Sequence, residues 1–118
     1  MAAPNIVNVT TITGKTATAN VTTVTANVIT NSAGSSTVLK LNNILLSNYA
    51  ASTQTANVII NRNSTSYYLG YSVSVPASSI LAVLGKDTSL YLEEGDVIQV
   101  NASSNSSINF VAGYEIIS

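Results

Sequence analysis

The chain has 118 residues, the usual size of one domain, and its 46% hydrophobic content is enough to build a core. Only 8% of its residues are charged, against about 25% in an ordinary globular domain, and its four Lys and Arg offer no basic patch for nucleic acid. The absence of Cys and His removes disulfides, thiolate chemistry and the usual zinc ligands, and no apolar run approaches the roughly 18 residues that span a bilayer.

The low charge favours a protein that works among other protein chains. A net charge of −1 gives little repulsion between copies, so such surfaces associate readily. Solubility must then come from the abundant Thr, Ser and Asn side chains. A protein built into an assembly tolerates such a surface, whereas a freely diffusing enzyme usually avoids it. Composition therefore predicts a structural role and a homo-oligomer.

Small apolar and β-branched side chains dominate the first quarter of the chain and predict two extended segments, about 5–12 and 16–30. The apolar positions change parity near residues 22–23, which indicates a bulge or bend there. Alone, this quarter could bury only a thin layer. It is therefore either a pair of edge strands or an arm laid onto a neighbouring subunit.

A turn at residues 31–36 divides the chain into an arm or edge strands, 1–30, and a β-sandwich domain, 31–118. If the first part is an arm, deleting it should leave a folded domain that no longer binds its partner. The arm residues expected to contact that partner are the larger apolar ones: Ile6, Val7, Val9, Ile12, Val21, Val24 and Val28.

Three strands are predicted in the middle of the chain. The first, 37–48, changes phase near its centre, which suggests a bulge, and the second covers 55–61. The third, 67–75, has the cleanest alternation of apolar and polar residues, with its odd positions toward the core. This alternation turns Tyr67 and Tyr71 inward.

The stretch 78–100 holds three short apolar runs separated by turn signals at 85–87 and 93–96. In such turns Gly accepts positive φ and Asp hydrogen-bonds its own backbone. A last alternating strand covers 108–116. Eight or nine short strands predict an all-β chain, folded as an antiparallel β-sandwich of jelly-roll or Greek-key type, to which the arm hypothesis adds an extended N-terminal arm.

The acidic residues offer no site that outweighs a simple turn. Asp87, Glu93, Glu94 and Asp96 could converge on Ca²⁺, but their spacing matches no EF-hand loop, and solvated hairpin turns explain the same residues. Glu94 with Glu115 or Asp96 could form a glycosidase pair, yet nothing in the local sequence builds an apolar pocket that would raise the pKa of one of them. There is also no His to act as base and no Gly-x-Ser-x-Gly motif. We therefore expect no enzyme, no cofactor and no metal.

Two tyrosines join the candidate interface. Tyr68 and Tyr91 fall on the faces opposite the expected core residues of their strands. An exposed Tyr can anchor a protein interface, stack on a sugar, or form a cross-strand pair that only covers a sheet face. All three roles stay open.

The opening residues, 1–16, and the segments 86–100 and 114–118 resemble small virion proteins of tailed phages of marine bacteria, cyanophages among them. The resemblance implies a structural part of the particle, first a capsid decoration (cement) protein and second a tail or fibre component. It implies a β-sandwich on the capsid surface of the virion that forms a homo-oligomer, preferably a trimer, and binds the major capsid protein or another virion protein. It transfers no functional residue.

A rival hypothesis from a different class is a carbohydrate-binding, lectin-like module. It would use Tyr68, Tyr91 and the Asn side chains of the loops. Saturable binding of a sugar by the isolated protein would favour it over the virion hypothesis.

Overall fold

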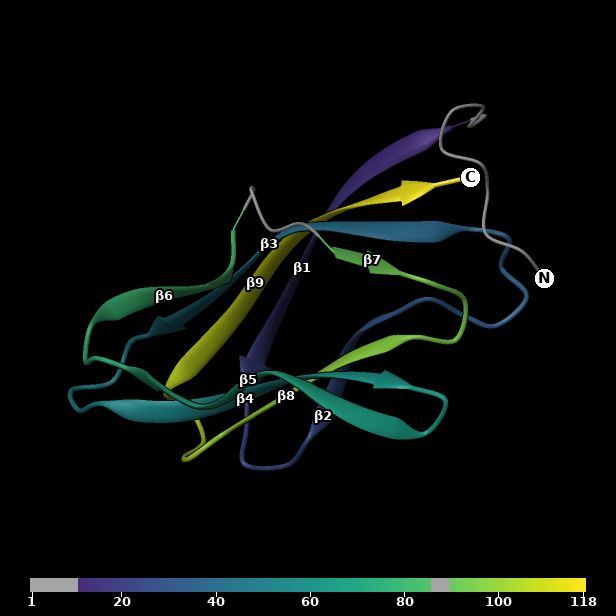
Figure 1. Cartoon of the computed structure of the whole chain (residues 1–118). Coiled ribbons are helices and arrows are strands. Elements are labelled where there is room, and N and C mark those ends of the chain that lie inside the picture. The colour runs from purple at the N-terminus through teal and green to yellow at the C-terminus, as the bar shows by residue number, and fades with distance from the viewer. Residues whose placement is uncertain (1–10, 86–89) are drawn as a thin grey trace.

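The computed structural model describes residues 11–85 and 90–118, and the regular structure within these two ranges consists of strands (Figure 1). The all-β prediction is confirmed, since none of the described residues is helical. The strands, in chain order, are β1 (Ile12–Val21), β2 (Ala26–Thr30), β3 (Val38–Asn48), β4 (Gln54–Arg62), β5 (Thr65–Val75), β6 (Ser79–Leu84), β7 (Leu90–Leu92), β8 (Val97–Ala102) and β9 (Ile108–Ile117).

The strands form two antiparallel sheets that pack as a β-sandwich. Sheet A has the order β1-β9-β3-β6, and β7 also pairs with β3; sheet B has the order β2-β8-β4-β5. In Figure 1, β1 and β9 lie side by side in the upper sheet although they stand at opposite ends of the chain. Most neighbours in each sheet are not consecutive in sequence, as in Greek-key and jelly-roll sandwiches.

The core lies between the sheets and follows the predicted alternation of side chains. On β3, Leu39 and Leu41 are buried, and after a change of phase Ile44 and Leu46 are buried instead. The register of β3 against β9 shifts at this point, which is the predicted bulge. The Asn43 Oδ1 accepts a hydrogen bond from the Gly113 backbone N–H at 2.8 Å, so a side chain holds the bulge in place.

Residues 12–30 form edge strands of the sandwich, and no extended arm is seen in the described part of the chain. β1 pairs with β9 along its whole length, and β2 pairs with β8. Val21 and Ile29 are 1% and 3% exposed and belong to the same core as the rest of the chain. The predicted bend near residues 22–23 is the connection by which the chain leaves sheet A and enters sheet B.

The predicted alternation of β5 is wrong in part. Tyr67 and Tyr71 were expected in the core, but they are 55% and 67% exposed. The register of β5 against β4 shifts twice, and Ser72 adopts a φ of 49°. Each shift adds a residue to β5, so the parity that faces the core is odd at Val73, even at Gly70 and odd again at Tyr67. The first shift accounts for Tyr71, whereas Tyr67 lies opposite the core-packing Ile60 and is exposed on the edge strand. A strand at the edge of a sheet can bulge in this way because its outer side has no ladder to interrupt.

Candidate functional site

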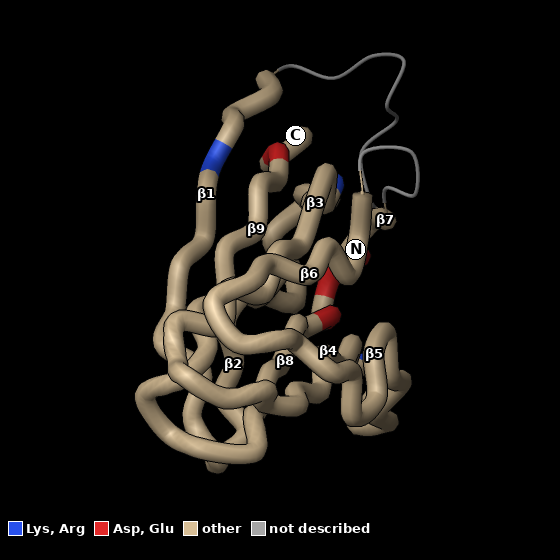
Figure 2. The backbone as a smooth tube through the Cα atoms, turned by 90° about the vertical axis from the view of Figure 1, so that its left-hand side faces the viewer, with Lys and Arg blue, Asp and Glu red and all other residues tan. Residues whose placement is uncertain are grey.

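Charged side chains are distributed unevenly between the two ends of the sandwich. Val21, Asn48 and Ile108 pair in one row of sheet A, so the connections that follow or precede them leave the sheet at the same end. None of the residues in the four connections at this end is charged, and in Figure 2 the loops below β1, β2 and β8 carry no blue or red. We call this the loop end; its connections are residues 22–25, 49–53, 76–78 and 103–107.

The loop end presents apolar side chains on connections that are tied together by hydrogen bonds. Val24 and Tyr49 are 71% and 51% exposed, and Ile80 at the start of β6 is 67% exposed. The Thr23 backbone N–H donates to the Asn105 Oδ1 at 2.9 Å, which joins the first connection to the last. These apolar groups are therefore exposed from a fixed backbone.

Asn48 fastens the loop end from within. Asn48 is only 1% exposed, and its Nδ2 donates to the carbonyl oxygens of Ser52 and Val75, both at 2.9 Å. Its Oδ1 accepts from the Ala50 backbone N–H at 2.9 Å. One buried amide therefore links β3, the following connection and the end of β5.

The opposite end is held by an ion pair. The Arg62 Nε lies 2.9 Å from the Asp96 Oδ1, and the Arg62 Nη2 lies 3.2 Å from the Glu93 Oε2. Asp96 is 2% exposed, and its Oδ2 also accepts from the Glu93 backbone N–H at 2.7 Å. The hydrogen bonds that Arg62 donates to Asp96 raise the pKa of the guanidinium, and the charges of Asp96 and Glu93 act in the same direction.

Backbone hydrogen bonds and the contacts with Arg62 hold the acidic turn in place. The Asp96 backbone N–H donates to the Glu93 carbonyl at 3.0 Å, and Gly95 has a φ of +90°, the left-handed conformation that glycine accepts without strain. Glu94 points elsewhere and accepts from the Ser36 backbone N–H. Among the described residues no group of three or more His, Cys, Asp or Glu is arranged to hold a metal ion, and Asp87 lies outside these residues.

The outer face of sheet B carries a row of amides that the sequence analysis did not identify. The Asn57 Nδ2 donates to the Asn101 Oδ1 at 2.7 Å, and the Asn101 Nδ2 donates to the Thr25 Oγ1 at 2.8 Å. The Asn57 Oδ1 accepts from the Ser72 backbone N–H at 2.7 Å. We call these linked groups the amide row; its members are Ser72, Asn57, Asn101 and Thr25. The row crosses β5, β4 and β8 and ends at the residue that precedes β2.

Two exposed tyrosines stand at one end of the amide row. Tyr68 and Tyr71 of β5 are 53% and 67% exposed, and their rings meet edge to face, with centroids 4.9 Å apart and planes at 83°. Tyr71 directly precedes Ser72, the backbone donor to Asn57. The signal in the sequence was the alternation of Asn57 and Asn101 with core valines, but only the register of the sheet shows that they meet.

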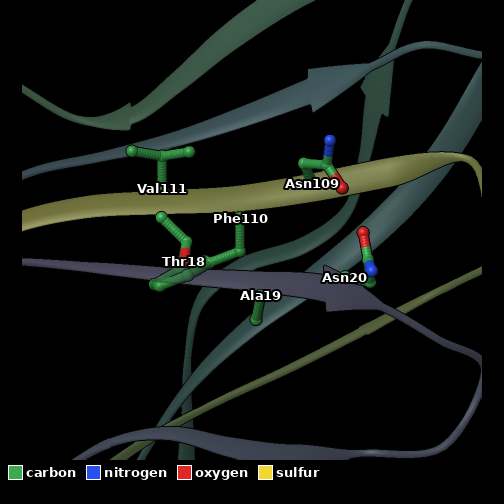
Figure 3. A pocket seen from close by; sticks show the side chains of 6 residues that line it. All are labelled: Thr18, Ala19, Asn20, Asn109, Phe110 and Val111. Carbon is green, nitrogen blue, oxygen red and sulfur yellow. The ribbon is translucent and has the colours of Figure 1, made fainter.

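A hollow of about 430 Å³ lies along β1 and β9. Figure 3 shows Thr18, Asn20, Asn109 and Val111 on one side of the two ribbons, which is the outer face of sheet A. Phe110 points to the other side, into the core. No ionisable side chain lines this hollow, so its lining offers no group for acid–base catalysis.

Six of the nine predicted interface residues lie in the described part of the chain, and these six do not form one surface. The parity of β1 turns Val21 into the core, and Val28 is half-buried against the same core. Ile12 is 56% exposed opposite Ile117, far along β1 from the loop end that contains Val24. The other placed residues are Tyr68 in sheet B and Tyr91, 39% exposed, in sheet A, whereas Ile6, Val7 and Val9 lie outside the described residues.

Comparison with known proteins shows a similar fold. No family model matches the chain, and no curated protein matches it. A chain in a solved structure of Bacillus endospore appendages, described as a novel family of disulfide-linked pili, aligns with 99% of this chain and 95% of its own length, with a TM-score of 0.53 and 8% identity. At that identity the likeness shows the fold alone. In residues 11–85 and 90–118 no helix has the length and apolarity to cross a membrane.

Proposed function

We propose that this protein is a non-enzymatic structural subunit that attaches to other protein chains through its loop end. The carrying observation is the loop end itself, where uncharged connections expose Val24 and Tyr49, with Ile80 exposed at the adjoining start of β6. Burying such a surface removes no charge from water, so the large desolvation cost of a buried charge does not arise. Because hydrogen bonds already fix the connections, little further ordering is required on binding.

The assembly that we propose is the virion of a tailed phage, with this chain as a capsid decoration protein. The resemblance of residues 1–16, 86–100 and 114–118 to small virion proteins supports this choice. In this assignment the protein forms a homo-oligomer, preferably a trimer, and binds the major capsid protein on the outer surface of the head. A tail or fibre position is the alternative within the same particle.

The pili described for the Bacillus chain are one case in which a chain of this fold is part of a larger assembly. Their disulfide links have no counterpart here, because the present chain contains no Cys. Disulfides therefore cannot link copies of this chain. In this proposal the contact depends on surface complementarity, which the loop end provides.

The test is to place a charge in the loop end. The double variant Val24→Asp/Tyr49→Asp should lower the affinity for capsids stripped of the protein by at least about tenfold, or roughly 1.4 kcal/mol, as measured by co-sedimentation. The matched control is Ser32→Asp, an exposed position at the opposite end, which should bind as the original chain does.

Circular dichroism of each variant excludes unfolding as the cause of a lost interaction. Equal binding by the double variant and the original chain would overturn the proposal. The copy number in purified virions, measured by quantitative mass spectrometry, separates the two positions: hundreds of copies fit a head decoration, and a few fit the tail.

A further inference from the structure

We propose that the outer face of sheet B binds a neutral polysaccharide. This second activity does not depend on attachment through the loop end or on the particle assignment. It uses the amide row together with side chains that flank it. We call the combined surface the glycan face; its members are Asn27, Asn57, Tyr68, Tyr71, Gln99 and Asn101.

The absence of charge on this face selects the class of ligand. The side chains that alternate with the core residues of sheet B are Asn, Gln, Thr, Ser, Tyr and aliphatic ones, and none of those described is ionisable at neutral pH. Arg62, the cation at the end of β4, is engaged with Asp96 and Glu93. A phosphate, sulfate or uronate would find no counter-charge here, so the ligand class that fits is neutral.

The two tyrosines provide a stacking corner. Their rings stand at 83° to each other, so one ring can serve as the floor and the other as the side wall for a sugar ring. Tyr68 lies opposite Ile59, an outward residue of β4 that is only 5% exposed. Aromatic faces that keep a wet hydroxyl are suited to the apolar C–H faces of sugars.

The amide row provides hydrogen-bonding groups in a fixed orientation. Asn57 and Asn101 each use one N–H and one lone pair of the side-chain amide within the row. An amide has two N–H donors and two lone pairs, so each of them keeps one donor and one acceptor for a ligand. Adjacent hydroxyls of a sugar, which both donate and accept, can pair with the N–H and the C=O of the same amide.

The extent of the face favours a chain of sugars over a single one. The amide row runs from β5 past β4 and β8 to the start of β2, and strands lie about 4.8 Å apart, so it extends for roughly 14 Å. Gln99 and Asn27 form a parallel pair beside it, with the Gln99 Nε2 2.8 Å from the Asn27 Oδ1. An oligosaccharide laid across the strands can contact the tyrosines and both sets of amides.

A second protein copy fits this face less well than a polysaccharide does. A flat protein surface pressed against it would bury the remaining amide donors and acceptors, and each of them would need a partner at its own position. A polymer of hydroxyl groups supplies such partners along its whole length. The mutual hydrogen bonds also hold the side chains ready, which reduces the entropy lost on binding.

The experiment screens the full chain on an array that carries neutral and acidic oligosaccharides, and then measures the best neutral ligand by isothermal titration. We expect saturable binding that is stronger for oligosaccharides than for the matching monosaccharides. Tyr71→Ala and Asn57→Ala should each weaken it by at least tenfold. The matched control is Tyr49→Ala, a tyrosine of similar exposure on the loop end, which should bind the sugar as the original chain does.

Three outcomes would overturn the inference: no saturable binding of any neutral oligosaccharide, binding of acidic ones alone, or binding that both variants leave unchanged. Self-association that Tyr71→Ala abolishes, without sugar binding, would assign the face to a second copy instead. Thermal unfolding of each variant shows that the fold persists. Loss of particle attachment in the loop-end variants would not affect this result, so the two proposals fail separately.

Discussion

Arg62 is the residue whose removal should affect stability most at the charged end of the sandwich. Asp96 is only 2% exposed. In Arg62→Ala its carboxylate loses the guanidinium partner but keeps the hydrogen bond from the Glu93 backbone N–H. A buried charge without its partner is costly, but the Arg62 side chain is itself 38% exposed and water screens the pair. We expect a loss of about 2 kcal/mol in the free energy of unfolding, measured by urea denaturation.

The control for Arg62 is the double variant Arg62→Ala/Asp96→Asn, which removes the unpaired charge and should recover part of the stability.

The contribution of Arg62 to stability depends on pH with a definite sign. Because folding raises the pKa of Arg62, its contribution is fully present below the unfolded pKa and is lost only as the pH rises through the folded pKa, in the strongly alkaline range. A loss of the Arg62 contribution between about pH 7 and pH 9 would contradict this account.

At the scale of single elements, substitutions in and beside β1 test whether this strand is part of the core or a removable arm. Val21 of β1 is 1% exposed, whereas Val24 in the next connection is 71% exposed. Val21→Ala should therefore cost about 2 kcal/mol, because it removes buried methyl groups and leaves a cavity. Val24→Ala should change the free energy of unfolding by less than about 0.5 kcal/mol.

The pair Val21 and Val24 is a matched comparison, since both are the same residue type within four positions. An arm would make the two substitutions equally mild, and that result in urea denaturation would contradict the fold.

By the same argument residues 31–118 alone should show no cooperative thermal transition, because they leave β8 and β9 without their outer partners. The hypothesis that this segment folds by itself came from the small side chains of the first quarter of the chain, which understated how far they share a core.

Element boundaries could be predicted here because they depend on local signals. The turn chemistry of 93–96 and the alternation of 108–116 each act within a few residues, and β8 and β9 begin and end close to the expected positions. The faces of β5 could not be predicted, since two bulges against β4 change which residues point inward. A bulge arises from the fit between two strands, and one sequence segment does not contain that information.

The amide row shows the same limit at the candidate site. The outward positions of Asn57 and Asn101 follow from their valine neighbours, but the two residues are 44 positions apart and meet only because β4 pairs with β8 in one register. A shift of that register by one residue would turn one of the two strands over and leave Asn57 and Asn101 on opposite faces of the sheet. Tyr68 was predicted to be exposed and is so; Tyr71 joined it because of the bulge at Ser72.

For the whole molecule, the separation of charged and uncharged ends predicts how attachment responds to salt. Screening acts on charges, with a Debye length of about 10 Å at 0.1 M and about 3 Å at 1 M salt. The described connections of the loop end carry no charge to be screened. Attachment through this end should therefore rest on apolar burial, which salts do not weaken by screening.

We expect the affinity for stripped capsids to change by less than about twofold between 50 mM and 500 mM NaCl, because the contact contains no ion pair from this chain. Calorimetry in the same buffers should give a negative heat-capacity change on binding, the mark of buried apolar surface. An affinity that falls steeply with salt would instead assign attachment to the end that carries Arg62, Glu93 and Glu94. The Val24→Asp/Tyr49→Asp variant should then bind normally, so salt dependence and mutation test the same surface by independent means.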